Sequence, residues 1–333
     1  MIRRKTINTL LASTLLATGL GLSLGLGSAQ AQERPPLKIL VGFPPGGTSD
    51  SLARLLADKL RDQLKQQVIV ENRPGVGGRL AAQAVKAARP DGQTFMVAPN
   101  ATFVYQHLTI PLKELGYDMT TDFTSIGQLT TFPLALVVNA GTQVKNAKEY
   151  VAWLKANPDK ATYGTAGAGG ETHFNGLQFG KVAGVPMQVV PYRGNGPLVI
   201  DLLGGQIQTG VMVAGDAIPH IRAGKLNAVG IFAPRRSPLL PEVPTMAEQG
   251  FDTGGNNGWM GMWGPANLPR AELERMQNAL KTVLELPDVK QAILTSFVQI
   301  AEFRPGAEVD RQLKSELDHW GPIIRASGFK PAL

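Results

Sequence analysis

The chain has 333 residues, no cysteine and a formal net charge of +7. The lack of cysteine excludes disulfide bonds, thiol catalysis, zinc ribbons and iron–sulfur clusters. Aromatic residues make up only 6% of the chain and no lysine or arginine block follows the N-terminal segment, so we expect no nucleic-acid partner and no cofactor.

The first 31 residues are predicted to form an export signal. Three basic residues occupy positions 3–5, an apolar run covers 10–26, and small residues precede a cleavage point after Ala31. An uncleaved N-terminal anchor is the alternative reading of the same pattern. Cleavage would leave 32–333 as the mature chain, which we expect in the periplasm.

The segment that follows alternates strands and helices. Apolar runs predict strands at 37–43 and 67–71 and a third strand that ends near Pro99. The spacing of apolar residues from Leu52 and an alanine-rich stretch at 79–88 predict the intervening helices. This order, βαβαβ, favours a parallel sheet with helices on both faces.

A second α/β unit begins with a predicted strand at 134–140. A helix is predicted at 146–158, and 161–180 again reads as strand, glycine cluster and helix. The chain ends in predicted amphipathic helices at 272–286, 287–297 and 306–328. We expect the chain to change lobes near 131–135 and 250–258, so that one lobe holds 32–133 and 253–333 and the other holds 134–252.

Glycine-rich junctions lead from a strand into a helix at "PPGGTSD" (44–50) and at "TAGAGGET" (165–172). The first N–H groups of a helix lack intrahelical partners and carry the positive end of its dipole, and glycine lets an anion approach the backbone closely. Glycine that serves only a tight turn is the alternative. Two such loops, one in each lobe, favour a ligand cleft.

A carboxylate suits these loops better than a phosphate. The first loop lacks the Gly-Lys-Ser/Thr of a P-loop, and no acidic residue is placed after the second loop to bind a ribose. A few amides and a hydroxyl, from Thr48 or Ser49 where these do not cap the helix, are enough to bind a carboxylate. Two loops facing each other would favour a dicarboxylate.

Charged residues near the loops each allow two interpretations. Asp50 would repel an anion unless Arg54, Arg73 or other donors neutralise it. His173 either touches a ligand or caps and packs locally. Arg193 either pairs with a ligand or stays solvated.

Sequence motifs for catalysis are lacking. The only G-x-S-x-G lies at 21–25, inside the predicted signal, and the four histidines form no metal-binding pair. We therefore assign no catalytic residue and no metal ligand. Trp259 and Trp263 lie beside glycines, and we expect core positions for them rather than a cleft lining.

The ordered segments "FPPGGTSDSLARLLADKL", "VIVENRPGVGGRLAAQAVKAARPDGQT", "YGTAGAGGETH", "VPYRGNGPLVIDLLGGQI" and "WMGMWGPANLP" resemble a known family from about residue 37 to the C-terminus. This family is the Bug (Bordetella uptake gene) or TctC-like periplasmic receptors of tripartite tricarboxylate transporters. The resemblance implies an α/β, two-lobed periplasmic-binding-protein fold, type II-like. Each lobe would hold a mixed, mostly parallel sheet flanked by helices, with the ligand cleft between them.

The resemblance also implies a function. A receptor of this kind captures a di- or tricarboxylate or an aromatic carboxylate and delivers it to a large and a small integral membrane subunit, and we expect it to be a monomer. Two alternatives remain at this point. The first is a ligand-sensing partner of a two-component histidine kinase, and the second is an exported hydrolase.

The family's carboxylate-binding loops map onto the two glycine junctions. The predicted ligand-binding residues are Phe43, Gly46, Gly47, Thr48, Asp50, Thr165, Ala166, Gly170, Glu171, Thr172, His173 and Arg193. Gly170 and Glu171 replace a serine–proline pair that is common in the family. Gln208 and Met212 stand at positions that are often acidic, which makes an amino-acid ligand less expected.

Overall fold

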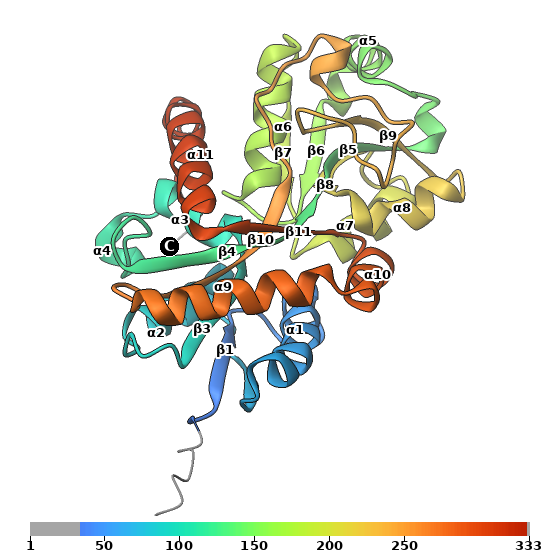
Figure 1. Cartoon of the computed structure of the whole chain (residues 1–333). Helices are drawn as coiled ribbons and strands as arrows, with labels where there is room; N and C mark the ends of the chain where they lie inside the picture. The colour runs from blue at the N-terminus through green and yellow to red at the C-terminus, as the bar shows by residue number, and fades with distance from the viewer. Residues whose placement is uncertain (1–33, 332–333) are drawn as a thin grey trace, which may run out of the picture. The chain divides into compact units, whose positions relative to one another are not determined.

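A computed structural model describes residues 34–331, which form two mixed β-sheets flanked by helices (Figure 1). The predicted export signal lies outside the described residues. No helix within 34–331 combines the length and apolar character needed to cross a bilayer.

The first sheet has six strands. In spatial order they are β11 (Ile300–Pro305), β4 (Phe123–Phe132), β10 (Gly258–Pro265), β3 (Thr94–Pro99), β1 (Leu37–Val41) and β2 (Val68–Asn72). The helices that accompany it in the chain are α1 (Thr48–Leu64), α2 (Arg79–Lys86), α3 (Asn100–Thr109), α4 (Leu112–Leu115), α9 (Arg270–Glu285), α10 (Pro287–Ser296) and α11 (Gly306–Ala326), with the 3-10 turn η1 (Val76–Gly78).

The second sheet has five strands. Their order is β7 (Gln188–Pro191), β6 (Thr162–Thr165), β8 (Thr209–Val213), β5 (Leu134–Asn139) and β9 (Leu226–Ile231). Its helices are α5 (Ala147–Ala156), α6 (Glu171–Val182), α7 (Asn195–Leu203) and α8 (Ala214–Arg222), and its 3-10 turns are η2 (Ala140–Thr142), η3 (Pro158–Lys160) and η4 (Ala247–Gln249).

The predicted βαβαβ unit is confirmed, because β1 pairs in parallel with both β2 and β3. The expectation that the sheets are mostly parallel is wrong. The pairs β10–β3, β10–β4 and β11–β4 are antiparallel, and in the second sheet β5 is antiparallel to both of its neighbours. Both sheets are therefore mixed, with antiparallel strands where the chain passes between them.

Strand β10 was not predicted, since its glycines and tryptophans resembled a loop. Every residue from Gly258 to Pro265 is nevertheless buried. A Cβ on Gly261 would lie 2.6 Å from the Trp263 ring and 2.8 Å from the Trp259 ring, so glycine makes room for both indoles. The two tryptophans are 0% and 1% exposed, which confirms their predicted core positions.

Helix α1 buries its apolar face, as its sequence pattern predicts. Leu52, Leu56 and Leu60 are fully buried and belong to the same apolar cluster as Ile39 of β1. Helix α9 lies alongside α1 and supplies Leu280 to that cluster (Figure 1). Burial of each such leucine stabilises the fold by about 2 kcal/mol, and this anchors α1 behind the first glycine junction.

The chain passes between the sheets twice. Only Pro133 separates β4 from β5, while residues 232–257 lead from β9 back to β10. These positions agree with the predicted crossings, although the lobe boundaries themselves remain a prediction.

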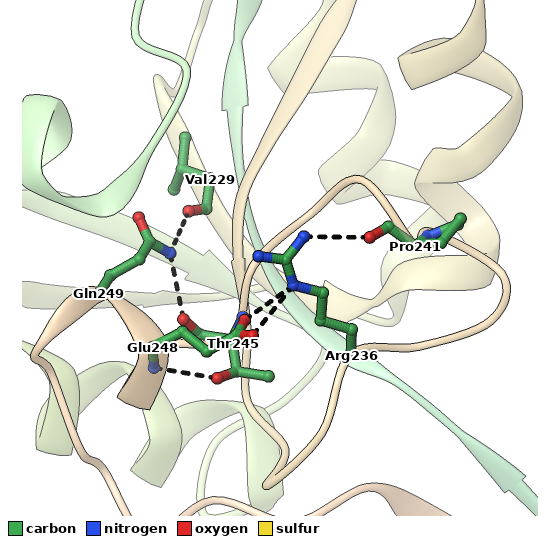
Figure 2. A network of polar contacts seen from close by, with 6 residues as sticks. All are labelled: Val229, Arg236, Pro241, Thr245, Glu248 and Gln249. Atoms are coloured by element: carbon green, nitrogen blue, oxygen red, sulfur yellow. Dashed lines mark hydrogen bonds and ion pairs between the residues drawn. The ribbon is translucent and has the colours of Figure 1, made fainter.

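Polar contacts fasten the longer connection to the second sheet (Figure 2). Glu248 accepts hydrogen bonds from the Arg236 guanidinium at 2.9 Å and the Thr245 amide at 2.7 Å, and its own N–H donates to the Thr245 hydroxyl. Gln249 donates to the Val229 carbonyl of β9 at 2.9 Å. The connection therefore leaves the second sheet from a fixed position.

The glycine that directly follows β1 offers a test of this packing. A Cβ on Gly42 would lie 2.3 Å from the Gly78 Cα, so Gly42→Ala must displace η1. We expect a loss of about 1–3 kcal/mol in the free energy of unfolding, measured by urea denaturation. Gly196→Ala, where the added Cβ meets nothing within 4 Å, is the matched control. Equal stability of both variants would contradict the packing described here.

Candidate functional site

The first glycine junction leaves the start of α1 without a side-chain cap. Gly47 is the N-cap residue in extended backbone (φ −75°, ψ 166°), and the helix begins at Thr48. The expectation that Thr48 or Ser49 might cap the helix is therefore wrong. Gly46, Gly47 and Thr48 are exposed, and the first N–H groups of a helix have no intrahelical acceptor.

Asp50 is neutralised, as the sequence analysis required. Its carboxylate accepts hydrogen bonds from Arg54 Nε at 3.0 Å, from Asn72 Nδ2 at 2.8 Å and from the Gly46 N–H at 2.9 Å. The bond to Arg54 is the largest influence that lowers the pKa of Asp50, to about 2. Arg73 instead pairs with Glu71 at 2.7 Å.

This arrangement removes one predicted donor from the site. The Gly46 amide is used within the loop by Asp50. The Asn72 amide also donates to the Phe43 carbonyl at 3.1 Å, which ties the loop to the end of β2. No acceptor within the described residues is found for the N–H groups of the α1 first turn.

Hydrogen bonds among its own residues hold the second glycine junction in place. Helix α6 begins at Glu171, and its N-cap residue, Gly170, makes no side-chain cap. The Thr172 hydroxyl shares a hydrogen bond with the Thr165 hydroxyl. His173 Nδ1 accepts from the Gly169 N–H at 3.1 Å. Burial lowers the pKa of His173, so the ring is neutral and acts as that acceptor. The local interpretation of His173 is thus the one that the structure supports.

Glu171 and His173 both lie in the buried first turn of α6. Glu171 is 7% exposed, and near it Asn100, the first residue of α3, donates from Nδ2 to Glu316 Oε2 at 3.2 Å. Phe174 stacks on Tyr105 of α3 with ring centroids 6.1 Å apart, and His173 makes an edge contact with Phe329 at 5.2 Å. The start of α6 is therefore packed against elements that accompany the first sheet.

Three of the remaining predicted residues are less buried than Glu171 and His173. Ala166 and Gly170 are half-buried, and Arg193 is exposed in the turn before α7. Between the loop at 43–48 and the loop at 165–173 no direct hydrogen bond is found among the described residues. The first loop approaches α3 near Gly78, since a Cβ on Gly78 would lie 3.5 Å from the Phe43 ring and 3.0 Å from the Thr102 hydroxyl.

The sequence analysis missed Asn100, Tyr105 and Glu316. Helix α3 was not predicted, so no role could be given to its first two turns. Glu316 did carry a signal, because it occupies the same face of α11 as the apolar residues Leu313 and Trp320. An acidic residue on the apolar face of a helix indicates a buried partner.

A polar cavity of about 330 Å³ lies beside Glu316. Its lining comes from β4, β11 and α11 and from the connection between β9 and β10, and includes Gln128, Arg235, Asn257 and Arg304. Among residues 34–331 no group of three His, Asp or Glu side chains could hold a metal ion.

A family model described as the tripartite tricarboxylate transporter family receptor matches residues 52–329. The chain belongs to this receptor family. The family and the fold are those of solute-binding proteins rather than enzymes.

Individual relatives extend this finding. The chain is 31% identical to a UPF0065 protein of Agrobacterium vitis, over 98% of this chain and 95% of the relative. The structure of MatC from Rhodopseudomonas palustris with bound malate is 28% identical (TM-score 0.73, 87% of this chain and 99% of MatC). Rpa4515 of R. palustris with adipate is 25% identical (TM-score 0.77, covering 89% and 98%).

The role of Asp50 can be tested by pH. Because its folded-state pKa lies below the ordinary value of 3.8, its contribution to stability is present above that value and lost as the pH falls toward 2. We expect Asp50→Asn to lose about 1–2 kcal/mol at neutral pH, with Arg54 partly screened by solvent. Urea unfolding between pH 6 and pH 3 measures the difference.

Asp62→Asn is the control in the same helix, since Asp62 is 71% exposed. A deficit for Asp50→Asn that stays constant as the solution is acidified would contradict the assignment.

Proposed function

We propose that this protein is a periplasmic receptor for a small organic carboxylate and delivers it to a tripartite tricarboxylate-type membrane transporter. The observation that carries the proposal is the match to the receptor family over residues 52–329. The uncapped starts of α1 and α6 are the candidate donors, although most other helices also lack a side-chain cap. Family membership and the malate and adipate bound by two similar proteins support a carboxylate.

The proposed donors are the backbone amides from Gly47 and Thr48 in one loop and from Gly170 to Thr172 in the other. Each charge-assisted hydrogen bond to a carboxylate contributes about 1.5–3 kcal/mol. Gly46 and Gly169 are excluded as donors because their amides already bind Asp50 and His173. Exposed Arg193 is retained as a mobile partner for a distal ligand charge.

Ligand binding would close the two lobes, 32–133 with 253–333 and 134–252, around the solute. A ligand shifts such an equilibrium only by its difference in affinity for the two states. Donors on both lobes provide that difference, because a dicarboxylate reaches both only when they are close. The closed form would be the one that the transporter recognises.

A ligand screen tests the proposal. We expect malate or adipate, but not a neutral sugar, to raise the melting temperature of the mature protein, because only the folded protein binds them. Calorimetry then gives the affinity. A protein stabilised by sugars or cations and by no carboxylate would refute the proposed ligand class.

The amide donor at Thr48 can be separated from its hydroxyl. Thr48 is the first residue of α1 and follows Gly47 in extended backbone, a setting that tolerates proline. Thr48→Pro removes both the N–H and the hydroxyl, while Thr48→Ala removes the hydroxyl alone. We expect Thr48→Pro to bind the carboxylate roughly 10–100-fold more weakly than Thr48→Ala. If both variants are folded by circular dichroism and bind the carboxylate with equal dissociation constants, the Thr48 amide is ruled out as a ligand donor.

A further inference from the structure

The polar cavity beside α11, about 330 Å³ in volume, is not used by the proposed solute site. Its walls come from β4, β11, α11 and the connection between β9 and β10. Strands β10 and β3 separate β4 from β1 in the first sheet, so the cavity lies toward the edge opposite the first glycine junction. Its lining within residues 34–331 includes none of the ligand-binding residues predicted from the sequence.

Strand pairing is irregular where the cavity meets the first sheet. Ala301 of β11 pairs with Thr130 of β4, and Arg304 pairs with Gln128, so residues 302–303 lie opposite a single residue of β4. An extra residue of this kind forms a β-bulge, which re-aims side chains and is common next to functional sites. Gln128 and Arg304, which bound the bulge, both line the cavity.

Gln128 has an unsatisfied acceptor. The residue is 0% exposed, and its Nε2 donates to the Glu302 carbonyl at 3.4 Å. Its Oε1 is buried and has no hydrogen-bond donor among the described residues. A buried oxygen without a donor costs about 1–3 kcal/mol. Because Gln128 lines the cavity, a bound molecule with a hydroxyl or N–H group can supply the missing donor.

Arg235 in the connection is a cation available to a ligand. Its neighbour Arg236 donates to the Glu248 carboxylate at 2.9 Å and to the Pro241 carbonyl at 3.2 Å (Figure 2). Arg235 instead lines the cavity, is exposed, and makes no ion pair or hydrogen bond with any described residue. A guanidinium offers a planar set of donors that fits a carboxylate. Arg235 can therefore bind an anion that enters the cavity.

The other charged groups of the cavity are already compensated. Arg304 Nε donates to the Glu302 carboxylate at 2.9 Å, and the Thr131 hydroxyl donates to the same group at 3.3 Å. Glu316 accepts three hydrogen bonds from neutral donors, and burial raises its pKa, which favours the uncharged acid. Arg235 thus gives the cavity one excess positive charge, which suits a monoanion.

Neutral polar groups complete the lining. The side chains of Asn256, Asn257 and Ser315 line the cavity and form no hydrogen bond with any other described residue. Amide and hydroxyl groups both donate and accept, so they match the hydroxyl groups of a polyol. The volume of the cavity lies within the range of about 300–1,000 Å³ in which proteins bind small molecules.

We propose that this cavity is a second binding site, separate from the glycine junctions, for a small hydroxylated monocarboxylate such as a sugar acid. Arg235 binds the carboxylate, and a hydroxyl of the ligand donates to Gln128 Oε1. The remaining hydroxyls exchange hydrogen bonds with Asn256, Asn257 and Ser315. The inference goes beyond the proposed solute site and does not depend on it.

Calorimetry with the mature protein and gluconate tests the site. Sorbitol keeps the hydroxyls of gluconate without its charge, and hexanoate keeps the charge and the chain length without the hydroxyls. We expect gluconate to bind and to raise the melting temperature, and the other two compounds to bind at least roughly tenfold more weakly. Equal binding of hexanoate and gluconate, or no binding of gluconate, would overturn the proposal.

Arg235→Gln removes the cation from the cavity. We expect it to weaken gluconate binding roughly 10–100-fold, which is the loss expected for charge-assisted hydrogen bonds. Arg311→Gln is the matched control, because Arg311 is an exposed arginine of α11 outside the cavity lining. It should bind gluconate as the wild type does. Equal weakening in both variants would mean attraction by overall charge and would count against the site.

Gln128→Met replaces the amide with an apolar side chain of similar length. Because the change removes a buried unsatisfied oxygen, we expect an unchanged or higher melting temperature for the ligand-free protein. Gluconate should bind roughly tenfold more weakly. A lower melting temperature with unchanged gluconate affinity would contradict the role of Gln128. If this buried variant does not fold, the exposed Arg235→Gln variant decides.

Thr48→Pro distinguishes the two sites. Gluconate bound in the cavity should keep its affinity in this variant, which changes only the first glycine junction. Gluconate binding that is lost in Thr48→Pro and retained in Arg235→Gln would locate gluconate at the glycine junctions and overturn the second site. Failure of malate and adipate to bind would reject the proposed function and leave this test unaffected.

Discussion

The helices that follow β1 and β6 both start behind glycine, and in both the first-turn N–H groups have no side-chain acceptor. A capping side chain at a helix start stabilises the helix by about 1 kcal/mol. Most helices described here lack such a cap. At α1 and α6 its absence leaves donors and the positive end of the helix dipole next to the two proposed ligand loops. The proposed receptor function depends on that local arrangement.

The surrounding residues maintain the loops without occupying these donors. In the first loop Asp50, Arg54 and Asn72 form a closed set of hydrogen bonds behind the helix start. In the second, neutral His173 binds the Gly169 amide, and the Tyr163 hydroxyl donates to the His173 carbonyl at 2.6 Å. The loops are therefore preorganised, which reduces the entropy lost when a ligand binds.

Local patterns allowed prediction of the parallel strands, the amphipathic helices and both glycine junctions. They did not reveal β4, β10 and β11, because these strands are defined by antiparallel neighbours far away in sequence. In β4 and β10, burial on both faces also removes the alternation that marks a half-exposed strand. The hydrogen bond between Asn100 and Glu316 was hidden because the two residues are 216 positions apart and meet only in the folded chain. The ligand-binding assignments thus remain predictions from the loops.

A crystal structure of the mature protein with a bound dicarboxylate tests the central claim most directly. The account predicts carboxylate oxygens within hydrogen-bonding distance of the first-turn amides of α1 and α6. A dicarboxylate bound elsewhere, with the amides at Thr48 and Thr172 facing solvent or covered by protein, would contradict it.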